Sequence, residues 1–393
     1  MALNFDFYTA PEIFFGRGRI MELPTICEQF GKKILIVKGG KSLEESGYLD
    51  IILNKFREKH YTIELMTVTS EPEVEQIDAM VGDAKTFGAD AVVAIGGGSV
   101  LDAAKAVAGL ITNGGSIMDY LEGVGSGKTI EKPAIPYIAA PTTAGTGTEV
   151  TKNAVISSRK HKFKKSIRHQ YLIPRIALVD PELTFSQPKA VTAACGMDAL
   201  TQLTEPYVSL KSNPFVDAIC LQGIKLVTKS LVRAWTDGND VEARQDMSLA
   251  SLLGGIALAN AGLGAVHGLA APLGAFFPVP HGVACATILP AAFQSNVNAL
   301  TQRGDKMTVL KKYAEISRHL TGNHEREDEA SIKMGIAWLT DLKKKLNIPS
   351  LKDMGITTED IPFIVNESRG SSMKTNPMTL TDDEIRNILV ASM

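Results

Sequence analysis

Three consecutive glycines followed by a serine, residues 96–99, constrain the fold of this chain more than any other segment. They join residues 91–95, an uncharged β-branched run that predicts a strand buried on both faces of a parallel sheet, to a helix-like segment at 100–110. Glycine has no Cβ, so a ligand can approach the backbone, and a helix N-terminus favours negative charge. The segment therefore predicts a pyrophosphate-binding turn whose helix is capped by Ser99. A tight turn without a ligand is the alternative, although one glycine would suffice for it.

Short apolar segments alternate with helix-like segments through the first half of the chain. Strands are expected at 33–37, 62–66, 91–95, 135–140 and 176–180, and helices at 49–56, 74–87 and 100–112. This alternation predicts parallel βαβ units in a doubly wound, Rossmann-like sheet. Ligands bind such sheets at the carboxyl ends of the strands, where the segments 39–40, 96–99 and 141–147 fall.

The pattern changes in the second half. No strand is expected beyond about residue 190, where Ala, Leu, Gly and Met dominate long helical periodicities up to Met393. The length of 393 residues also exceeds what one hydrophobic core usually holds. We therefore expect an α/β plus all-α fold, with a dinucleotide-binding α/β domain at 1–186 and an all-helical domain at 187–393.

The composition argues against several classes of function. A net charge of −2 without a long basic run argues against nucleic acid as a partner. The apolar stretch 249–273 is rich in Gly and Ala and is interrupted by Asn260 and His267, so it predicts a buried helix pair and not a membrane span. Four cysteines without CxxC spacing indicate free thiols in a reducing compartment. The first residues, Met1-Ala-Leu-Asn, begin no signal-peptide pattern, so we expect a cytoplasmic protein.

Residue types that bind metals occur in the helical half. Asp198 and Gln202 are four apart on a helix-like segment, which places them on one face. His267 and His281 each precede a glycine in apolar surroundings. Either histidine alone is more often a core or capping residue. A carboxylate together with two imidazoles, however, is a ligand set for Fe(II), Zn(II) or Mn(II), so Asp198, His267 and His281 are candidate metal ligands.

Ordered motifs along nearly the full length carry a resemblance to a known family. They are Phe14-Phe-Gly-Arg-Gly18, Gly96-Gly-Gly-Ser-Val-Leu-Asp-Ala-Ala-Lys105, Pro141-Thr-Thr-Ala-Gly-Thr-Gly-Thr-Glu-Val150, Gly196-Met-Asp-Ala-Leu200, Val266-His-Gly268, Pro280-His-Gly282 and Thr375-Asn-Pro377. The chain resembles the iron-containing (group III) alcohol dehydrogenases. The resemblance implies a dehydroquinate synthase-like fold, in which a dinucleotide-binding domain precedes an all-α domain, and a bound metal ion.

The resemblance implies that Asp198, His267 and His281 are catalytic metal ligands, with Fe(II) or Zn(II) as the ion. The fourth ligand of the family is a histidine, and Gln202 stands at that place. The carbonyl oxygen of Gln202 is a weaker donor than imidazole toward these ions, so we expect Gln202 to bind weakly or the site to be free of metal. A further family histidine, thought to relay protons, is Ala271 here. The proton would then leave through ribose hydroxyls, water or another group.

The resemblance also assigns residues to a nicotinamide dinucleotide. The implied contacts are Gly97, Gly98, Ser99, Asp102, Thr142, Thr143, Thr146, Lys164 and Leu183. For Lys164, which lies in the basic run 159–165, a solvated loop is an equally good interpretation.

The end of the first expected strand bears on the choice between NAD and NADP. An acid at this position would bind the ribose 2′-hydroxyl and favour NAD. This chain instead has Gly39, Gly40, Lys41 and Ser42, which we include among the cofactor-binding residues. Because Lys41 and Ser42 can bind a 2′-phosphate, the sequence favours NADP over NAD.

These features together predict an oxidoreductase that transfers a hydride between NAD(P)(H) and a primary alcohol or aldehyde with the help of a metal. One alternative is different chemistry on the same scaffold: a metal-independent, maleylacetate reductase-like enzyme, a hydroxyacid/oxoacid transhydrogenase, or a cyclase such as dehydroquinate synthase. Another alternative is a catalytically silent nucleotide-binding or structural protein. The expected partners are a small-molecule substrate and further copies of this chain, in a homodimer or larger homo-oligomer.

Overall fold

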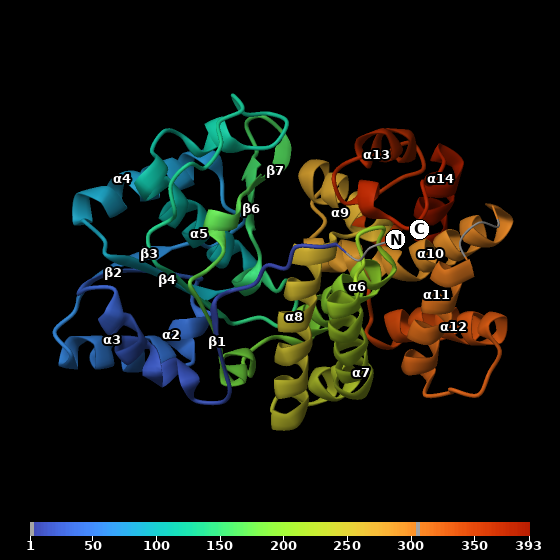
Figure 1. Cartoon of the computed structure of the whole chain (residues 1–393), viewed down its shortest axis with the longest axis horizontal. Helices are drawn as coiled ribbons and strands as arrows, with labels where there is room; N and C mark the ends of the chain where they lie inside the picture. The colour runs from blue at the N-terminus through green and yellow to red at the C-terminus, as the bar shows by residue number, and fades with distance from the viewer. Residues whose placement is uncertain (1–3, 304–306) are drawn as a thin grey trace. The chain divides into compact units, whose positions relative to one another are not determined.

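The computed structural model describes residues 4–303 and 307–393 (Figure 1). Contacts within the chain group these residues into two units. The α/β unit comprises 8–143 and 147–187, and the helical unit comprises 188–303 and 307–393 with the short segments 4–7 and 144–146. Residues 1–3 and 304–306, which the sequence places in the two expected domains, lie outside the described residues.

A six-stranded parallel sheet forms the centre of the α/β unit. Its strands are β1 (Glu12–Phe15), β2 (Lys33–Lys38), β3 (Thr62–Thr67), β4 (Ala91–Gly96), β5 (Tyr137–Pro141) and β8 (Ile176–Val179), in the order β1-β8-β5-β4-β2-β3. The five expected strands are all present, which confirms the parallel α/β prediction. Strand β1 was not expected; it is a short edge strand that pairs with β8.

Helices cover the two faces of this sheet. They are α1 (Leu23–Ile26), α2 (Ser42–Glu45), α3 (Tyr48–Glu58), α4 (Val74–Phe87) and α5 (Gly98–Asn113). In β2, Leu35 and Val37 belong to the apolar core that contains α4 and α5, whereas Ile34 and Ile36 belong to the core that contains α3. Because successive side chains of a strand point to opposite faces, a strand buried on both faces must be apolar throughout. Figure 1 shows α4 and α3 on opposite sides of the strands.

The turn between β4 and α5 departs from one expectation. The N-cap of α5 is Gly97, and among the described residues no side chain caps this helix. Ser99 lies within the first turn, so its predicted role as the cap is wrong. A Cβ at Gly96 would lie 2.5 Å from Cγ2 of Val100, so the turn packs too tightly for a side chain there. The first N–H groups of α5 are therefore left for a ligand.

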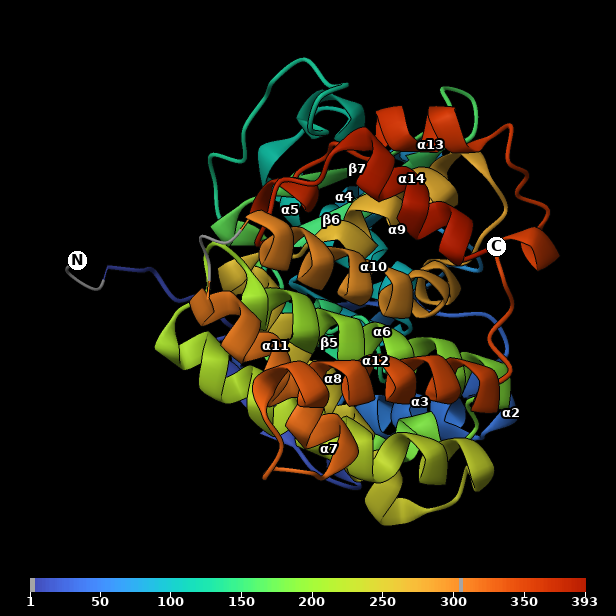
Figure 2. The ribbon, with the colours of Figure 1, turned by 90° about the vertical axis from the view of Figure 1, so that its right-hand side faces the viewer.

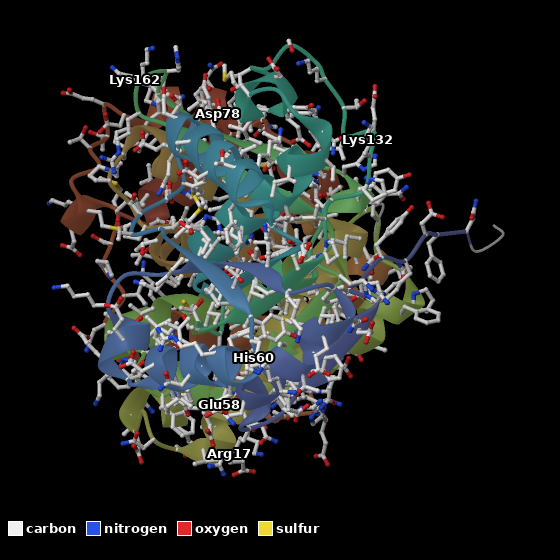
Figure 3. The ribbon with its side chains drawn as sticks, turned by 90° about the vertical axis from the view of Figure 1, so that its left-hand side faces the viewer. Arg17, Glu58, His60, Asp78, Lys132 and Lys162 are labelled. Atoms are coloured by element: carbon white, nitrogen blue, oxygen red, sulfur yellow. The ribbon has the colours of Figure 1, made fainter. Side chains whose placement is uncertain are left out.

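An antiparallel hairpin, β6 (Asn153–Ser158) and β7 (Phe163–Arg168), was not expected. The sequence interpretation of 159–165 as a solvated basic loop is wrong for residues 163–165, which lie in β7. Phe163 and Ile167 are buried, but three polar residues separate them, so the sequence shows no strict alternation over this strand. Lys162, with a φ of 51°, lies in the connection between the strands and is labelled in Figure 3.

A buried lysine ties α5 to the segment that follows β5. The Nζ atom of Lys105 donates hydrogen bonds to the main-chain oxygens of Thr148, Thr151 and Asn153 at 3.0, 2.9 and 2.8 Å. Burial lowers the pKa of Lys105 to about 8, although the nearby Asp102 carboxylate acts in the opposite direction. Lys105 thus fixes α5 relative to the segment 148–153, which continues from the threonine-rich loop at 141–147.

The helical unit is built around α6. Its helices are α6 (Lys189–Val208), α7 (Pro214–Thr236), α8 (Val241–Ala261), α9 (Ala265–Phe276), α10 (His281–Arg303), α11 (Met307–Thr321), α12 (Asp328–Lys345), α13 (Ile361–Glu367) and α14 (Asp382–Ala391). Figure 2 faces this unit, with α10, α11 and α12 toward the viewer. Most of α6 is buried, since α7, α8 and α10 pack against it. No strand occurs in the described residues of this unit, as the sequence predicts.

Short 3₁₀ helices complete the elements of both units. They are η1 (Arg19–Glu22), η2 (Cys27–Gln29), η3 (Ile117–Tyr120), η4 (Thr148–Val150), η5 (Gln170–Leu172), η6 (Pro181–Thr184), η7 (Lys352–Met354) and η8 (Met373–Thr375).

The apolar stretch 249–273 forms parts of α8 and α9, which bend by 99° at their junction. Within the described part of the chain, no single helix is long and apolar enough to cross a membrane. Taken together, the bent pair of α8 and α9 has the length and composition of a membrane span. Many of its apolar side chains, such as Ile256 and Leu269, lie in the core of the helical unit or are otherwise buried.

We predict that Lys105→Met destabilises the protein by about 3 kcal/mol or more, because buried main-chain oxygens lose their donor and Asp102 loses the nearby cation. Urea unfolding followed by circular dichroism measures this change. Lys85→Met, on the exposed face of α4, is the matched control and should change the free energy of unfolding by less than about 0.5 kcal/mol. Equal stability of the two variants would contradict the structural role of Lys105.

Candidate functional site

Helix α6 carries three polar side chains on one buried face. Asp198, Gln202 and Glu205 follow one another at spacings of four and three residues, which the helical period brings to the same side. Their exposed fractions are 1, 2 and 6%. Because an ionised carboxylate is costly to bury without partners, the two acids must be matched by donors or cations from neighbouring elements.

Glu205 finds its partners at the start of α9. Its Oε1 accepts a hydrogen bond from the main-chain N–H of Val266 at 2.6 Å, and its Oε2 lies 2.7 Å from Nδ1 of His267. A Cβ at Gly264 would lie 2.9 Å from Oε1 of Glu205, so a glycine permits this close approach. With Nδ1 of His267 held by a carboxylate, Nε2 is the atom left to bind a metal, an arrangement common among metal-bound histidines.

Asp198 lies beside both histidines. Its Oδ1 is 3.3 Å from Nε2 of His267 and 3.9 Å from Nε2 of His281, the first residue of α10. Cys285, four residues further along α10, places its Sγ 3.8 Å from each of these two Nε2 atoms. One potential ligand atom from each of the four residues lies within 4.8 Å of the others. The His281 side chain is 34% exposed, whereas those of Asp198 and His267 are buried, so the cluster is accessible from the side of His281.

The cluster is strongly coupled electrostatically. Burial alone would raise the pKa of Asp198, but the neighbouring His267 and His281 lower it below its usual value. Burial would lower the pKa of His267, yet Cys285, Asp198 and Glu205 raise it well above its usual value. Burial raises the pKa of the Cys285 thiol to about 12. The arrangement concentrates negative charge around imidazole nitrogens, as a divalent cation site does.

The residues present fit a divalent metal ion. Oδ1 of Asp198 is buried and receives no hydrogen bond from any described residue, although it lies at the centre of the cluster. A carboxylate oxygen and two imidazole nitrogens, with a sulfur close by, suit Fe(II) or Zn(II). The structure thus brings together three of the four expected ligands, Asp198, His267 and His281.

Gln202 makes a different contact. Its Nε2 donates a hydrogen bond to Oδ2 of Asp198 at 3.2 Å, on the carboxylate oxygen that does not face the histidines. Its Oε1 is buried and has no hydrogen-bond partner within residues 4–303 and 307–393. The amide therefore holds the carboxylate, and metal binding through Oε1 stays a prediction.

Most of the expected cofactor residues follow neighbouring strands. Gly39 to Ser42 follow β2, Gly97 to Ser99 follow β4, and Thr142 and Thr143 lie at the end of β5. Strands β5, β4 and β2 are adjacent and parallel, so these segments meet at one edge of the sheet. A Cβ at Gly40 would meet open space among the described residues, and one at Gly97 would touch only the Thr143 side chain, at 3.5 Å. Together with the uncapped start of α5, these segments suit a pyrophosphate.

Four expected cofactor residues make contacts within the protein or lie apart from the loops that follow β2 and β4. Asp102 is buried, and its Oδ2 accepts a hydrogen bond from the main-chain N–H of Val155 at 3.1 Å. Burial raises its pKa to about 6. Lys164 forms an ion pair with Glu71. Leu183, in η6, packs in the core of the α/β unit, and Thr146 belongs to the short segment grouped with the helical unit.

The lysines after β2 have distinct roles. Lys38 is buried, and its Nζ pairs with Glu44 at 2.8 Å and donates to the main-chain oxygens of Gly39 and Gly40 at 3.2 Å. Lys41 is exposed at the N-cap of α2. Lys41 is therefore the lysine of this segment that could meet a 2′-phosphate.

Sequence reasoning missed Cys285 of the cluster and Glu205, which holds His267. Glu205 lies seven residues after Asp198 on the same face of α6, and Cys285 lies four residues after His281. Each spacing places the pair on one side of a helix, which is a signal that the sequence offers, but it does not show which helix faces pack against one another.

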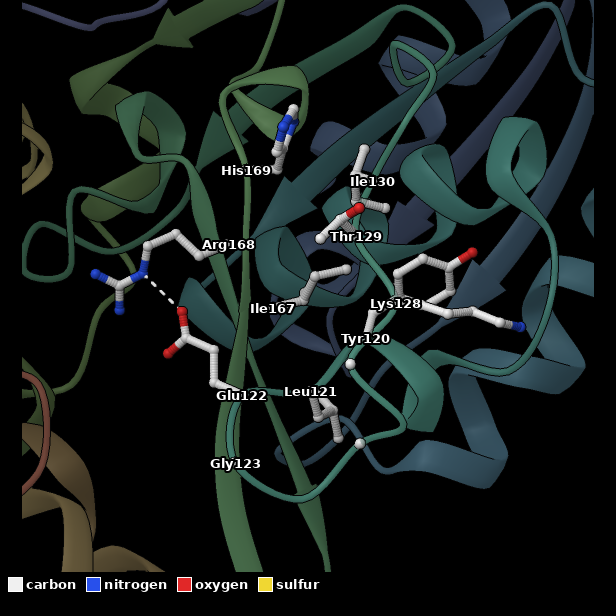
Figure 4. Close-up of a pocket in the computed structure, with 12 residues that line it drawn as sticks. Tyr120, Leu121, Glu122, Gly123, Lys128, Thr129, Ile130, Ile167, Arg168 and His169 are labelled. Atoms are coloured by element: carbon white, nitrogen blue, oxygen red, sulfur yellow. Dashed lines mark ion pairs between the residues drawn. The ribbon is translucent and has the colours of Figure 1, made fainter.

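A separate surface pocket of about 240 Å³ lies in the α/β unit between the 120–130 segment and the end of β7 (Figure 4). Leu121, Ile130 and Ile167 contribute apolar surface, and Glu122 pairs with Arg168 at 3.2 Å at its rim. The residues that line it include none of the expected site residues.

Comparison with known proteins gives consistent matches. The family model described as iron-containing alcohol dehydrogenase matches residues 10–181, and that of the C-terminal part of the Fe-containing alcohol dehydrogenase family matches 192–393. The chain is 36% identical to alcohol dehydrogenase 4 of Saccharomyces cerevisiae, covering 98% of this chain and 97% of that protein. It is 33% identical to the NAD-dependent methanol dehydrogenase of Bacillus methanolicus, covering 98% of each. The crystal structure of a 1,3-propanediol oxidoreductase superposes with a TM-score of 0.92 at 30% identity and covers 100% of both chains.

We predict that Gln202→His tightens metal retention at least tenfold, because an imidazole replaces an amide beside Asp198. Metal content after dialysis against graded chelator concentrations measures the change. Gln202→Leu, which offers no donor, is the control and should not tighten retention. Equal metal content in Gln202→His and the unaltered protein would count against residue 202 as a ligand position.

Proposed function

This chain belongs to the iron-containing alcohol dehydrogenase family, and from that premise we propose how its own residues interconvert an alcohol and an aldehyde. The observation that carries the proposal is the group of Asp198, His267 and His281, whose ligand atoms lie close together; Asp198 and His267 are buried, and His281 is partly exposed. The substrate class that fits it is a primary alcohol or the corresponding aldehyde.

Three side chains would hold the metal. Asp198 would bind it through Oδ1, and His267 and His281 through their Nε2 atoms. A divalent ion bound there supplies a Lewis acid that stabilises negative charge on the oxygen of the substrate. Glu205 keeps His267 in the required tautomer by accepting its Nδ1 proton in a hydrogen bond. The partly exposed His281 marks the side from which substrate would approach.

The glycine turn and the threonine loop would hold the dinucleotide. The N–H groups at the start of α5 would bind the pyrophosphate, with Thr142 and Thr143 contributing hydroxyl groups. A nicotinamide ring bound there supplies or accepts the hydride. The NAD-dependent methanol dehydrogenase to which the chain is similar supports a nicotinamide cofactor. Ala271, exposed on α9, offers no proton acceptor, so we propose that the proton leaves through water or a ribose hydroxyl.

We also propose that the protein is a cytoplasmic homodimer or larger homo-oligomer. The rings of Phe5 and Phe7 lie tilted against the ring of Phe215, at centroid distances of 5.5 and 5.7 Å, and Phe215 is 61% exposed. An exposed aromatic group of this kind is typical of surfaces that bind another protein chain.

Removal of the metal tests the proposed function. We predict that treatment with a chelator lowers the rate of aldehyde reduction more than tenfold and that added Fe(II) or Zn(II) restores it. A rate unchanged by chelation, in protein shown to be free of metal, would support the metal-independent reductase. Cofactor binding without turnover on any aldehyde, with metal present, would support the silent nucleotide-binding protein.

Cofactor choice tests the segment after β2. We predict that kcat/KM with NADPH exceeds that with NADH by about tenfold, since a charge-assisted contact of Lys41 with the 2′-phosphate contributes about 1.5–3 kcal/mol. Gly39→Asp should reverse the order by repulsion, and a Cβ at Gly39 meets only Val100 Cγ2 at 3.7 Å, an ordinary contact.

Gly39→Asn is the matched neutral control for this substitution and should keep the preference for NADPH. The preference should also shrink as ionic strength rises. A clear preference of the unaltered protein for NADH would overturn the assignment of Lys41.

A further inference from the structure

We infer that the Cys285 thiolate is a protein ligand of the metal, and that Gln202 orients Asp198 instead of binding the ion. This inference rests on the proposed function, because it concerns the same metal centre. It changes the ligand set from one carboxylate, two imidazoles and an amide to one carboxylate, two imidazoles and a thiolate.

The distances between donor atoms carry the inference. In a tetrahedral zinc site with metal–nitrogen bonds of about 2.0–2.1 Å and metal–sulfur bonds of about 2.3 Å, neighbouring donors are roughly 3.3–3.6 Å apart. Here, Sγ of Cys285 is 3.8 Å from Nε2 of His267 and 3.8 Å from Nε2 of His281. Oδ1 of Asp198 is 3.3 and 3.9 Å from the same two nitrogens. These distances are within a few tenths of an ångström of those in a tetrahedral site, and the four donors all lie within 4.8 Å of one another, so small shifts would bring them onto one ion.

The fold directs Cys285 into this group. His281 and Cys285 are four residues apart on α10, so both project from the same face of the helix. Cys285 is fully buried, and both nitrogens nearest to its sulfur belong to candidate ligands. The buried Oδ1 of Asp198, which no described residue supplies with a hydrogen bond, faces the same space. When the sulfur–metal bond forms, the S–H bond breaks and the thiol proton is released to solvent, so the thiol contributes one released proton for each ion bound.

Gln202 occupies the other side of the carboxylate. Its Nε2 donates to Oδ2 of Asp198 at 3.2 Å, which leaves Oδ1 directed toward the histidines. Helix α8 packs closely against it, since a Cβ at Gly254 would lie 3.3 Å from Cβ of Gln202. Gln202 is thus a positioning residue, and Cys285 of α10 supplies the fourth ligand in its place.

A thiolate alters the choice of metal. Sulfur is a softer donor than oxygen or nitrogen and favours Zn(II) and Co(II) over Fe(II) beyond the general affinity order of these ions. We therefore expect the unaltered protein to retain Zn(II) over Fe(II) by a larger factor than Cys285→Ser does.

Cobalt substitution tests the inference without recourse to activity. The full-length protein is freed of metal and titrated with Co(II), and its absorption spectrum is recorded. The unaltered protein should show a sulfur-to-cobalt charge-transfer band in the near ultraviolet, together with visible d–d bands. Cys285→Ser should lose the charge-transfer band, keep d–d bands, and bind Co(II) at least tenfold more weakly. Cys195→Ser, a partly buried cysteine of α6 outside the cluster, should retain the band.

The outcomes separate this inference from the proposed function. Visible d–d bands without a charge-transfer band in the unaltered protein would overturn thiolate ligation while leaving the metal centre of the proposed function intact. A charge-transfer band that survives in Cys285→Ser but disappears in Cys195→Ser would overturn it as well. Absence of any cobalt spectrum in correctly folded protein would overturn both the inference and the metal-dependent function. The Gln202→Leu variant should keep the charge-transfer band, whereas its loss would contradict a purely positioning role.

Discussion

The burial of two carboxylates on one face of α6 is the constraint on which the helical unit depends. Asp198 and Glu205 lie within an apolar helix packing, where an unmatched charge would be costly. Glu205 is matched by the main-chain N–H of Val266, in the first turn of α9, and by His267, which ties the start of that helix to α6. Asp198 has Gln202 on one oxygen and imidazoles on the side of the other. A bound cation would compensate the remaining negative charge of Asp198. The same two buried carboxylates would thus matter both for the packing of the helices and for metal binding.

In the α/β unit, the main constraint is that main-chain N–H groups must stay accessible to an anion. Parallel strands in the order β5-β4-β2 bring three loops to one edge, and the absence of a side-chain cap on α5 leaves its N–H groups available. Lys105 is a buried cation of this unit and binds the main chain of the segment 148–153 from within α5. Helix α5 therefore has two roles: Lys105 fixes it to the segment 148–153, and the N–H groups of its first turn stay available to an anion.

The sequence predicted those parts of the molecule that repeat a simple period. The β-branched runs at 33–37 and 91–95 identified central strands because both faces of such strands must be apolar. Strand β7 was not predicted because only Phe163 and Ile167 of its residues are apolar and three polar residues separate them. The cap of α5 was placed two residues too late, at Ser99, because Gly97 takes the cap position. Asp198, His267 and His281 were found as chemical types, whereas Glu205 and Cys285 required knowledge of which helix faces pack together. Tertiary packing, and not local sequence, decides those two.

X-ray absorption spectroscopy at the edge of the bound metal tests the central claim most directly, because it reports the donor atoms themselves. The ligand set of Asp198, His267, His281 and Cys285 predicts one sulfur neighbour at about 2.3 Å and nitrogen or oxygen neighbours at about 2.0–2.1 Å in zinc-loaded protein. A first shell of nitrogen and oxygen alone, in protein that retains one zinc ion per chain, would contradict the account.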